Sequence, residues 1–283
     1  MIEMDLPVRN QKGSGHMDYI RKKIGFICDM DGVIYHGSQI LPGVKEFVFW
    51  LQNEGKRFLF LTNSSERSPR ELRLRLLNMG LDVGEEHFYT SALATADFIA
   101  SQSPFCTAYV IGQSGLLNAL YEVGVTFSDI DPEYVIVGET NNYAFDAIQK
   151  AVNLVLNGAK LIGTNPDISG PYEHGISPAC KALVAPIELV TGKTAYFIGK
   201  PNPLMMRTGM KLLGTSREET VIIGDRMDTD IVAGIESEID TVLVLSGVTN
   251  LKNLHDFPYR PRYILNHVGE IITRADGDLG IQI

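Results

Sequence analysis

The sequence predicts an α/β protein with a parallel β-sheet, interrupted by a second and smaller α/β unit. Short apolar runs alternate with helical patterns along most of the 283 residues, which is typical of a parallel sheet that helices cover on both faces. The middle of the chain repeats this alternation between two halves of the first unit. Polar residues follow several apolar runs, so we expect a ligand site at one edge of the first sheet.

The first unit is assembled from both ends of the chain. Ser68-Pro69 is a typical helix start and Gly80 a typical stop, so the segment between them is predicted to be helical. The predicted strands of this unit are 24–28, 57–63, 220–225 and 241–247, and its predicted helices are 47–55, 67–80 and 230–237.

The second unit lies between these halves. Its predicted strands are 107–112, 133–140 and 160–167, its predicted helices are 116–124 and 145–158, and the Pro, Ser and Gly-rich stretch 169–178 is predicted to be a loop. We therefore predict a core domain formed by 18–100 and 196–283, with an inserted domain over 101–195. Residues 1–17 are polar and end in Gly-Ser-Gly-His-Met; we interpret them as a tag or flexible N-terminal extension outside the fold.

The composition narrows the class of partner. The formal net charge of −9 repels phosphate backbones and anionic lipids, so we expect neither a nucleic-acid polymer nor a membrane as partner. A local lysine or metal ion still allows a small phosphorylated metabolite to bind. Three cysteines without a C-x-x-C pair argue against a disulfide framework and favour the cytoplasm. A homo-oligomer is compatible with this composition.

Polar residues follow neighbouring strands of the first sheet. Asp29 and Asp31 come directly after the first strand, Thr62-Asn63 after the second, and Asp225 after a later one. The carboxyl ends of parallel strands meet at one edge, so these side chains are predicted to lie together. Carboxylates held close need a compensating cation, and oxygen-rich sites suit Mg²⁺. Lys200, Asp228 and Asp230 are the other charged residues expected near this edge.

The spacing of Asp29 and Asp31 suits two roles in one reaction. Residues i and i+2 of an extended segment point to the same side, so one carboxylate could attack phosphorus while the other handles the leaving-group proton. Gly32 would let the backbone turn sharply near a phosphate. The structural alternative is that acids at strand ends form turns or cap helices. Lys200 and Thr62-Asn63, in this order along the chain, favour the functional interpretation.

The motifs DMDGV, LTN, GKP and GDRMDTD, in this order, resemble those of the haloacid dehalogenase superfamily of phosphatases, and the flanking sequence resembles its NagD-like branch. The segments FYTSALATADF, VIVGET, GTNPD and LVLSGV extend the resemblance over about 24–273. The family implies a Rossmann-like core with a parallel sheet and an inserted α/β cap domain of the C2 type, which closes over the site and selects the leaving group.

The resemblance also implies a role for each matching residue. Asp29 matches the nucleophile, which is also a metal ligand, and Asp31 matches the general acid/base, whose backbone carbonyl touches the metal. Lys200 matches the lysine that holds nucleophile and phosphate. Asp225 matches the remaining protein ligand of Mg²⁺, and Asp230 an acid that supports it. The expected substrate-binding residues are Asp31, Gly32, Thr62, Asn63, Lys200, Arg226, Met227, Asp228 and Thr229.

Several residues keep two interpretations. Asp228 could be an exposed loop acid, and Asp230 could cap the helix that follows it. The polar residues after the second-unit strands could contact substrate or form hydrogen bonds within the cap; they are Glu139, Thr140, Asn141, Tyr143, Asn165 and Asp167.

The activity that the resemblance implies is a Mg²⁺-dependent phosphomonoester hydrolase with a phosphoaspartyl intermediate. Nucleoside monophosphates such as UMP or GMP are the first expected substrates. The alternatives are a sugar-phosphate, phosphoglycolate or p-nitrophenyl phosphate phosphatase of the same family, or a non-catalytic regulator that binds a phosphorylated metabolite.

Overall fold

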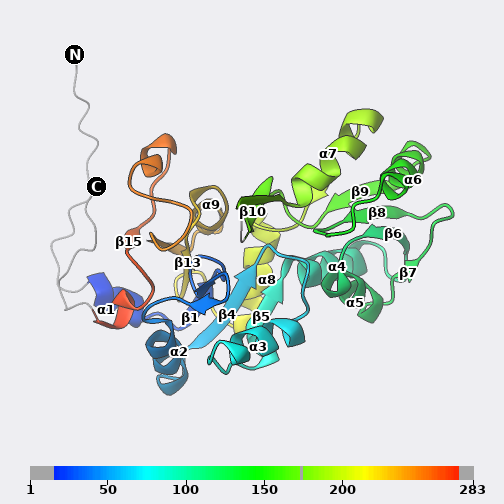
Figure 1. Ribbon diagram of the computed structural model, residues 1–283. Coiled ribbons are helices and arrows are strands. Elements are labelled where there is room, and N and C mark those ends of the chain that lie inside the picture. Colours follow the sequence, from blue (N-terminus) through cyan, green and yellow to red (C-terminus); the bar gives the residue numbers. More distant parts are fainter. Residues whose placement is uncertain (1–15, 173–174, 274–283) are drawn as a thin grey trace, which may run out of the picture.

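The structure, a computed structural model, describes residues 16–172 and 175–273 and contains two parallel sheets that lie side by side (Figure 1). The larger sheet has six strands in the order β15-β14-β13-β1-β4-β5, and every neighbouring pair is parallel. Its strands are β1 (Gly25–Cys28), β4 (Arg57–Thr62), β5 (Phe88–Thr90), β13 (Thr220–Gly224), β14 (Asp240–Val244) and β15 (Tyr263–Leu265). This confirms the predicted parallel sheet built from both ends of the chain.

Helices cover both faces of this sheet, because successive residues of each strand point to opposite sides. In β1, Phe26 and Cys28 pack into one apolar cluster, whereas Ile27 packs into a second. The first face is covered by α1 (His16–Arg21), α2 (Val44–Asn53), α3 (Pro69–Asn78) and α10 (Glu270–Thr273), and the second by α4 (Ser91–Gln102), α8 (Pro203–Leu213) and α9 (Val232–Glu236).

The smaller sheet has five parallel strands in the order β12-β9-β8-β6-β7. Its strands are β6 (Thr107–Ile111), β7 (Thr126–Phe127), β8 (Tyr134–Val137), β9 (Lys160–Gly163) and β12 (Tyr196–Phe197). The helices α6 (Phe145–Leu156) and α7 (Cys180–Thr191) pack on one face, and α5 (Ser114–Glu122) packs on the other beside α4. One apolar cluster runs from the larger sheet through α4 to the smaller sheet.

One predicted boundary of the inserted unit falls inside a helix, and the other lies directly before a short strand of the smaller sheet. The boundary after residue 100 lies within α4, which ends at Gln102. The boundary after residue 195 lies directly before Tyr196 and Phe197, which pair with Ile162 and Gly163 as the edge strand of the smaller sheet. Short strands are difficult to predict from two residues of sequence, since only their pairing defines them.

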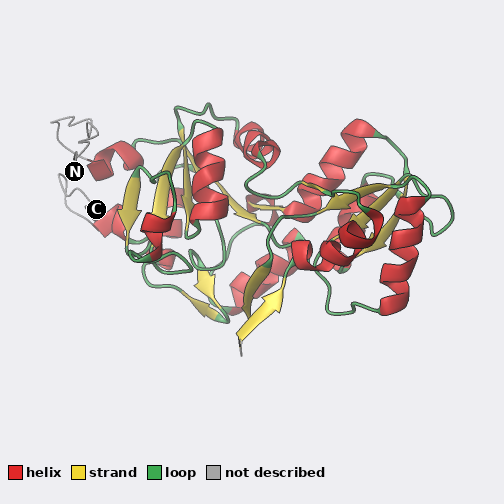
Figure 2. Ribbon diagram, turned by 90° about the horizontal axis from the view of Figure 1, so that it is seen from above, coloured by secondary structure: helices red, strands yellow, loops and turns green. Residues whose placement is uncertain are grey.

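The stretch 169–178 is an antiparallel pair of strands, β10 (Ser169–Tyr172) and β11 (Gly175–Pro178), and the prediction of a loop was wrong. Proline and glycine disfavour interior strands. A two-stranded ribbon tolerates proline because each strand has one open edge that needs no N–H donor. Figure 2 shows this ribbon between the two lobes of the molecule.

The N-terminal extension was predicted to include residue 17, but Met17 is fully buried in the larger core cluster. It lies on α1, which is tied to the C-terminal helix by a hydrogen bond of 2.7 Å from Arg21 Nε to the Ile271 carbonyl. Residues 1–15 and 274–283 lie outside the described residues. In the part of the chain that the structure describes, no helix is long and apolar enough to cross a membrane.

Candidate active site

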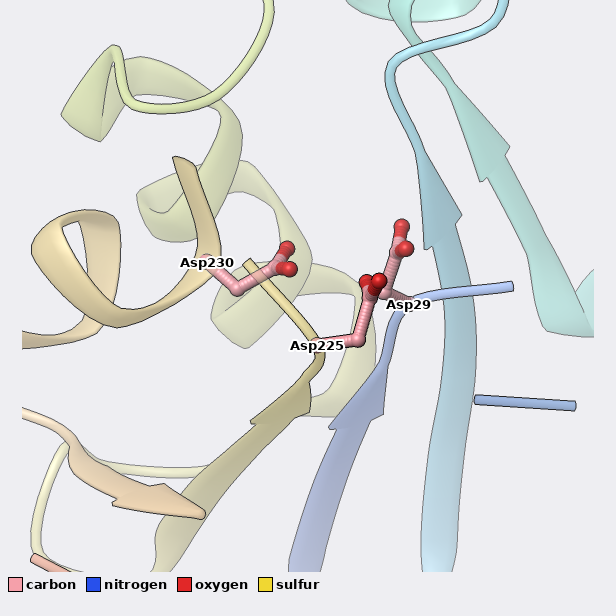
Figure 3. Close-up of side chains that lie close together, drawn as sticks. All are labelled: Asp29, Asp225 and Asp230. Carbon is pink, nitrogen blue, oxygen red and sulfur yellow. The ribbon is translucent and has the colours of Figure 1, made fainter. Parts of the chain in front are cut away.

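The carboxyl ends of β1, β4 and β13 meet at one edge of the larger sheet, as predicted. The register pairs Cys28 with Phe60 on one side and with Ile223 on the other, so the residues that follow these strands are neighbours. Asp29, Asp225 and Asp230 each place a carboxylate oxygen within 4.8 Å of the others. Figure 3 shows the three side chains directed toward one another from β1, β13 and the turn that follows β13.

Lys200 lies between two of these carboxylates. Its ammonium group donates to Asp29 Oδ1 at 2.5 Å, to Asp230 Oδ1 at 2.6 Å and to the Leu61 carbonyl at 3.2 Å. The side chain is only 2% exposed. All three ammonium protons therefore have acceptors, which is what a buried charge requires.

Asp225 is held by backbone groups that only glycine allows to come so close. A Cβ atom on Gly247 would lie 2.0 Å from Asp225 Oδ2, and one on Gly32 would lie 2.6 Å from the same atom. That oxygen accepts a hydrogen bond of 2.7 Å from the Val248 N–H. The other oxygen, Oδ1, is buried without a hydrogen-bond partner among the described residues.

Burial is the largest influence on the pKa values of the three carboxyl groups in this cluster. It raises the pKa of Asp29, which Lys200 opposes, and it raises the pKa of Asp230 to about 6. The pKa of Asp225 lies well above its ordinary value because the group is buried and faces Asp29. Burial alone would lower the pKa of Lys200, but Asp230 and Asp29 outweigh it and the pKa is raised. The lysine is therefore a permanent cation beside three carboxylates.

The residues at this edge fit a divalent cation. With all three carboxylates ionised, the one ammonium would leave two negative charges for a bound cation to offset, and the unpartnered Asp225 Oδ1 offers a buried oxygen ligand. Hard oxygen donors of this kind suit Mg²⁺. Asp230 uses one oxygen for Lys200 and the other to accept from the Arg226 N–H at 3.1 Å, so its predicted supporting position agrees with its hydrogen bonds.

Asp31 lies outside the carboxylate cluster but lines the same cleft as Asp29. Its Oδ1 is 3.7 Å from His36 Nδ1, and burial raises the pKa of the Asp31 carboxyl while His36 and Arg75 oppose the shift. The hairpin beside it, β2 (Tyr35–His36) and β3 (Gln39–Ile40), is held by Arg75, which lies over the Tyr35 ring at 4.6 Å. Gly32 adopts a φ of 78°, which favours glycine at this turn.

Thr62 and Asn63 both line the cleft, but their hydrogen bonds and their exposure differ. Thr62 Oγ1 accepts from the Ser64 N–H at 3.1 Å and is partly exposed. Asn63 is buried, and its side-chain amide bonds to both backbone groups of Lys200. Its Oδ1 accepts from the lysine N–H at 2.7 Å, and its Nδ2 donates to the lysine carbonyl at 2.9 Å. These hydrogen bonds fix the backbone of Lys200, whereas sequence reasoning described Asn63 only as a substrate contact.

Residues 226–229 begin the turn η2 (Met227–Ile231) and separate into two groups. Arg226 and Thr229 line the cleft. Met227 is 1% exposed and packs in an apolar cluster with Ile231. Asp228 is exposed and pairs with the Arg226 guanidinium at 2.8 Å, which agrees with its interpretation as a loop acid. The prediction of substrate contacts is therefore untested for Arg226 and Thr229 and has no side-chain support for Met227.

The polar residues of the cap were predicted either to contact substrate or to form hydrogen bonds within the cap. The structure adds a third arrangement, which is hydrogen bonds to the core. Two of these residues make hydrogen bonds within the cap. The Tyr143 hydroxyl donates to the Leu183 carbonyl, and the Thr140 hydroxyl accepts from the Asn142 N–H. Asn141 is exposed at the cleft. Glu139, Asn165 and Asp167 instead bond to the core segment that carries Asn63 and Ser65.

The cleft between core and cap has a volume of about 1420 Å³. Small-molecule pockets are typically about 300–1,000 Å³, so this cleft is larger than a typical small-molecule pocket. Sequence reasoning missed the segment after β14 on its wall: Ser246 Oγ donates to the Gly32 carbonyl at 2.7 Å, and Val248 holds Asp225. The only signal was the segment LVLSGV, which extended the family resemblance without a role for any of its residues.

Two family models match the chain at positions that agree with this site. The model described as haloacid dehalogenase-like hydrolase matches residues 26–126, and a second, HAD-hydrolase-like, matches 197–271. The chain belongs to the haloacid dehalogenase-like hydrolase family, with a Rossmann-like core and a cap domain.

Particular relatives define the class of enzyme more closely. The chain is 44% identical to a dihydroxyacetone phosphatase of Corynebacterium glutamicum, over 91% of this chain and 94% of the relative. It is 42% identical to the ribonucleotide monophosphatase NagD of Escherichia coli, over 87% of this chain and 96% of the relative. The NagD structure from that species superposes with a TM-score of 0.84 at 41% identity, over 89% of this chain and all of the other. The protein is a phosphatase of this family, a phosphomonoester hydrolase.

Proposed function

We propose that the protein hydrolyses phosphate monoesters with Mg²⁺ through a phosphoaspartyl intermediate on Asp29. The observation that carries this proposal is the 2.5 Å contact of Asp29 with Lys200 beside Asp225, at a sheet edge that opens into the cleft. A carboxylate held in this way is oriented toward a bound ester, and Lys200 offsets charge on both partners.

The hydrolysis proceeds in two displacements. In the first, an Asp29 oxygen attacks phosphorus, the ester P–O bond breaks, and Asp31 gives its proton to the leaving oxygen. In the second, Asp31 takes a proton from water, whose oxygen attacks phosphorus and releases phosphate and Asp29. Burial raises the pKa of Asp31, which favours the protonated form that the first displacement needs.

Asp29, Asp225 and the backbone carbonyl of Asp31 are the groups that would hold Mg²⁺. The unpartnered Asp225 Oδ1 supports this assignment. Bound Mg²⁺ supplies positive charge against the carboxylates and the transferring phosphoryl group. Asp230 keeps Lys200 and the Arg226 backbone in place beside these ligands.

The proposed substrates are small phosphorylated metabolites, with nucleoside monophosphates first. The cleft volume of about 1420 Å³ supports a leaving group as large as a nucleoside. Dihydroxyacetone phosphate is the second candidate, supported by the 44% identity to a dihydroxyacetone phosphatase.

The test is phosphate release from UMP, GMP, dihydroxyacetone phosphate, glucose 6-phosphate, phosphoglycolate and p-nitrophenyl phosphate, with Mg²⁺ and with chelator. Release that requires Mg²⁺ is the expected result, and the order of kcat/KM values identifies what the cap selects. If the folded protein released phosphate from none of them, the non-catalytic regulator would replace the enzyme.

We also propose that the protein works in the cytoplasm. The support is that Cys28, Cys106 and Cys180 are all buried and free, as expected in a reducing compartment. Labelling the thiols of freshly purified denatured protein would show three reactive groups.

A further inference from the structure

Lys200 lies at the seam between the two sheets. Two residues after β12 ends in the smaller sheet, the Gly199 N–H donates to the Thr164 carbonyl at 2.7 Å. A Cβ atom on Gly199 would lie 2.7 Å from Asn165 Cβ and 2.7 Å from Asn63 Oδ1, so glycine is required where core and cap approach. The backbone that carries the lysine is therefore in contact with cap residues as well as core residues.

Asn63 fixes the backbone of Lys200 from the core side. Its side-chain amide accepts from the lysine N–H and donates to the lysine carbonyl. Its own carbonyl accepts from Asn165 Nδ2 at 2.6 Å and from the Ser91 hydroxyl. Both ends of Asn63 are thus held, one by the lysine and one by a cap side chain.

Glu139 holds the other side of this arrangement. Its Oε1 accepts from Asn165 Nδ2 at 2.5 Å, and its Oε2 accepts from the Ser65 N–H at 3.1 Å and from the Ser65 hydroxyl. Ser65 and Asn165 are both fully buried. Both carboxylate oxygens of Glu139 are therefore used by protein donors, although the residue lies at the wall of the cleft.

We propose that Glu139 is a positioning residue that links the cap to the catalytic lysine. Through Asn165 and Ser65 it fixes Asn63, and through Asn63 it fixes the backbone of Lys200 relative to Asp29. The inference rests on the proposed function, in which Lys200 serves the nucleophile. It adds that the cap contributes to the chemical step as well as to the choice of leaving group.

The substitution Glu139→Gln tests this link with little change in volume. A glutamine has one acceptor oxygen and one amide donor, so it must place its NH₂ against a donor of either Asn165 or Ser65. The matched control is Asp129→Asn, which removes a cap carboxylate from an exposed pair with Lys150.

The kinetic experiment measures kcat and KM for p-nitrophenyl phosphate below the unfolding temperature. We expect Glu139→Gln to lower kcat about 10- to 100-fold, because small misplacements of a catalytic group cost that much, with KM changed less than about threefold. Asp129→Asn should leave both unchanged. A residue that only stabilises the fold would lower the unfolding temperature and leave kcat unchanged, and that result would overturn the inference.

Amide hydrogen exchange gives a second measurement that needs no activity. The Lys200 N–H bonds to Asn63, so Glu139→Gln should speed exchange in the peptide that covers 198–201, and Asp129→Asn should not. Unchanged exchange there would overturn the inference even if the wild type released no phosphate, a result that would count against the proposed function separately. If Glu139→Gln failed to fold, Asn165→Ser breaks the same path and should show both effects.

Discussion

At the carboxyl edge of the larger sheet, β1 and β13 are followed by Asp29 and Asp225, whereas at the same edge of the smaller sheet β8 and β9 are followed by Glu139 and Asn165. The first pair faces the cleft beside one lysine, with a buried carboxylate oxygen that has no partner among the described residues. The second pair is joined by a hydrogen bond between its own side chains, and each member also bonds to the core segment 63–65.

The comparison shows that the carboxyl edge of a parallel sheet can carry either a ligand site or a contact between two domains. Unsatisfied carboxylates at a buried edge are costly, and the metal ion of the proposed function would offset that cost. Satisfied polar groups at a similar edge join two parts of the molecule. Lys200 belongs to both edges, since its ammonium group faces the first and its backbone is fixed by residues bound to the second.

The largest effect is expected from the nucleophile at the core edge. Asp29→Asn should lower kcat for p-nitrophenyl phosphate by roughly 10⁴-fold or more, because the covalent route is lost. Circular dichroism should show the same fold, and Asp129→Asn serves as the control. Near wild-type turnover by this variant would remove the proposed mechanism.

The metal requirement is the next sharpest test of the same edge. Chelation should abolish phosphate release, and added Mg²⁺ should restore it. Asp225→Asn should raise the Mg²⁺ concentration for half-maximal activity by at least about 10- to 100-fold. Activity that persists in chelator after extensive dialysis would contradict the assignment.

Removal of the shared lysine should affect stability as well as rate. Lys200→Met leaves Asp29 and Asp230 without the ammonium group that both now contact. Breaking a buried ion pair on one side typically costs about 3–5 kcal/mol, measurable as a lower midpoint in urea. The double variant Lys200→Met with Asp230→Asn should recover part of this loss, and no recovery would show that the pair is not coupled.

The smallest effect concerns pH. Burial and the charge of Asp29 raise the pKa of Asp225 above the ordinary value of 3.8. Between the unfolded and folded pKa values the folded protein binds more protons, so its stability falls as pH rises through that window. In chelator, the Tm of Asp225→Asn minus that of the wild type should therefore increase as pH rises above the ordinary value of 3.8. If this difference in Tm did not change with pH, the ionised form of Asp225 would not be disfavoured in the folded state.

Sequence reasoning was strongest where chemistry restricts the residue. Asp29, Asp225 and Lys200 were identified because parallel strands bring their ends together and because like charges need a cation. It could not decide between the interpretations of Glu139 and Asn165, since their partners in the core lie 74 residues or more away in the chain. Met227 and Met17 show a second limit: a residue in a polar segment can be buried by tertiary packing. The β10–β11 ribbon shows a third, because pairing outweighed composition.

The most direct test of the central claim is to detect the phosphoaspartyl intermediate. The enzyme is mixed with excess p-nitrophenyl phosphate and Mg²⁺, quenched in acid within a turnover, digested and analysed by mass spectrometry. The account predicts a phosphorylated peptide that contains Asp29 and disappears with chelator or in Asp29→Asn. Rapid phosphate release with no phosphorylated peptide, together with an active Asp29→Asn variant, would contradict it.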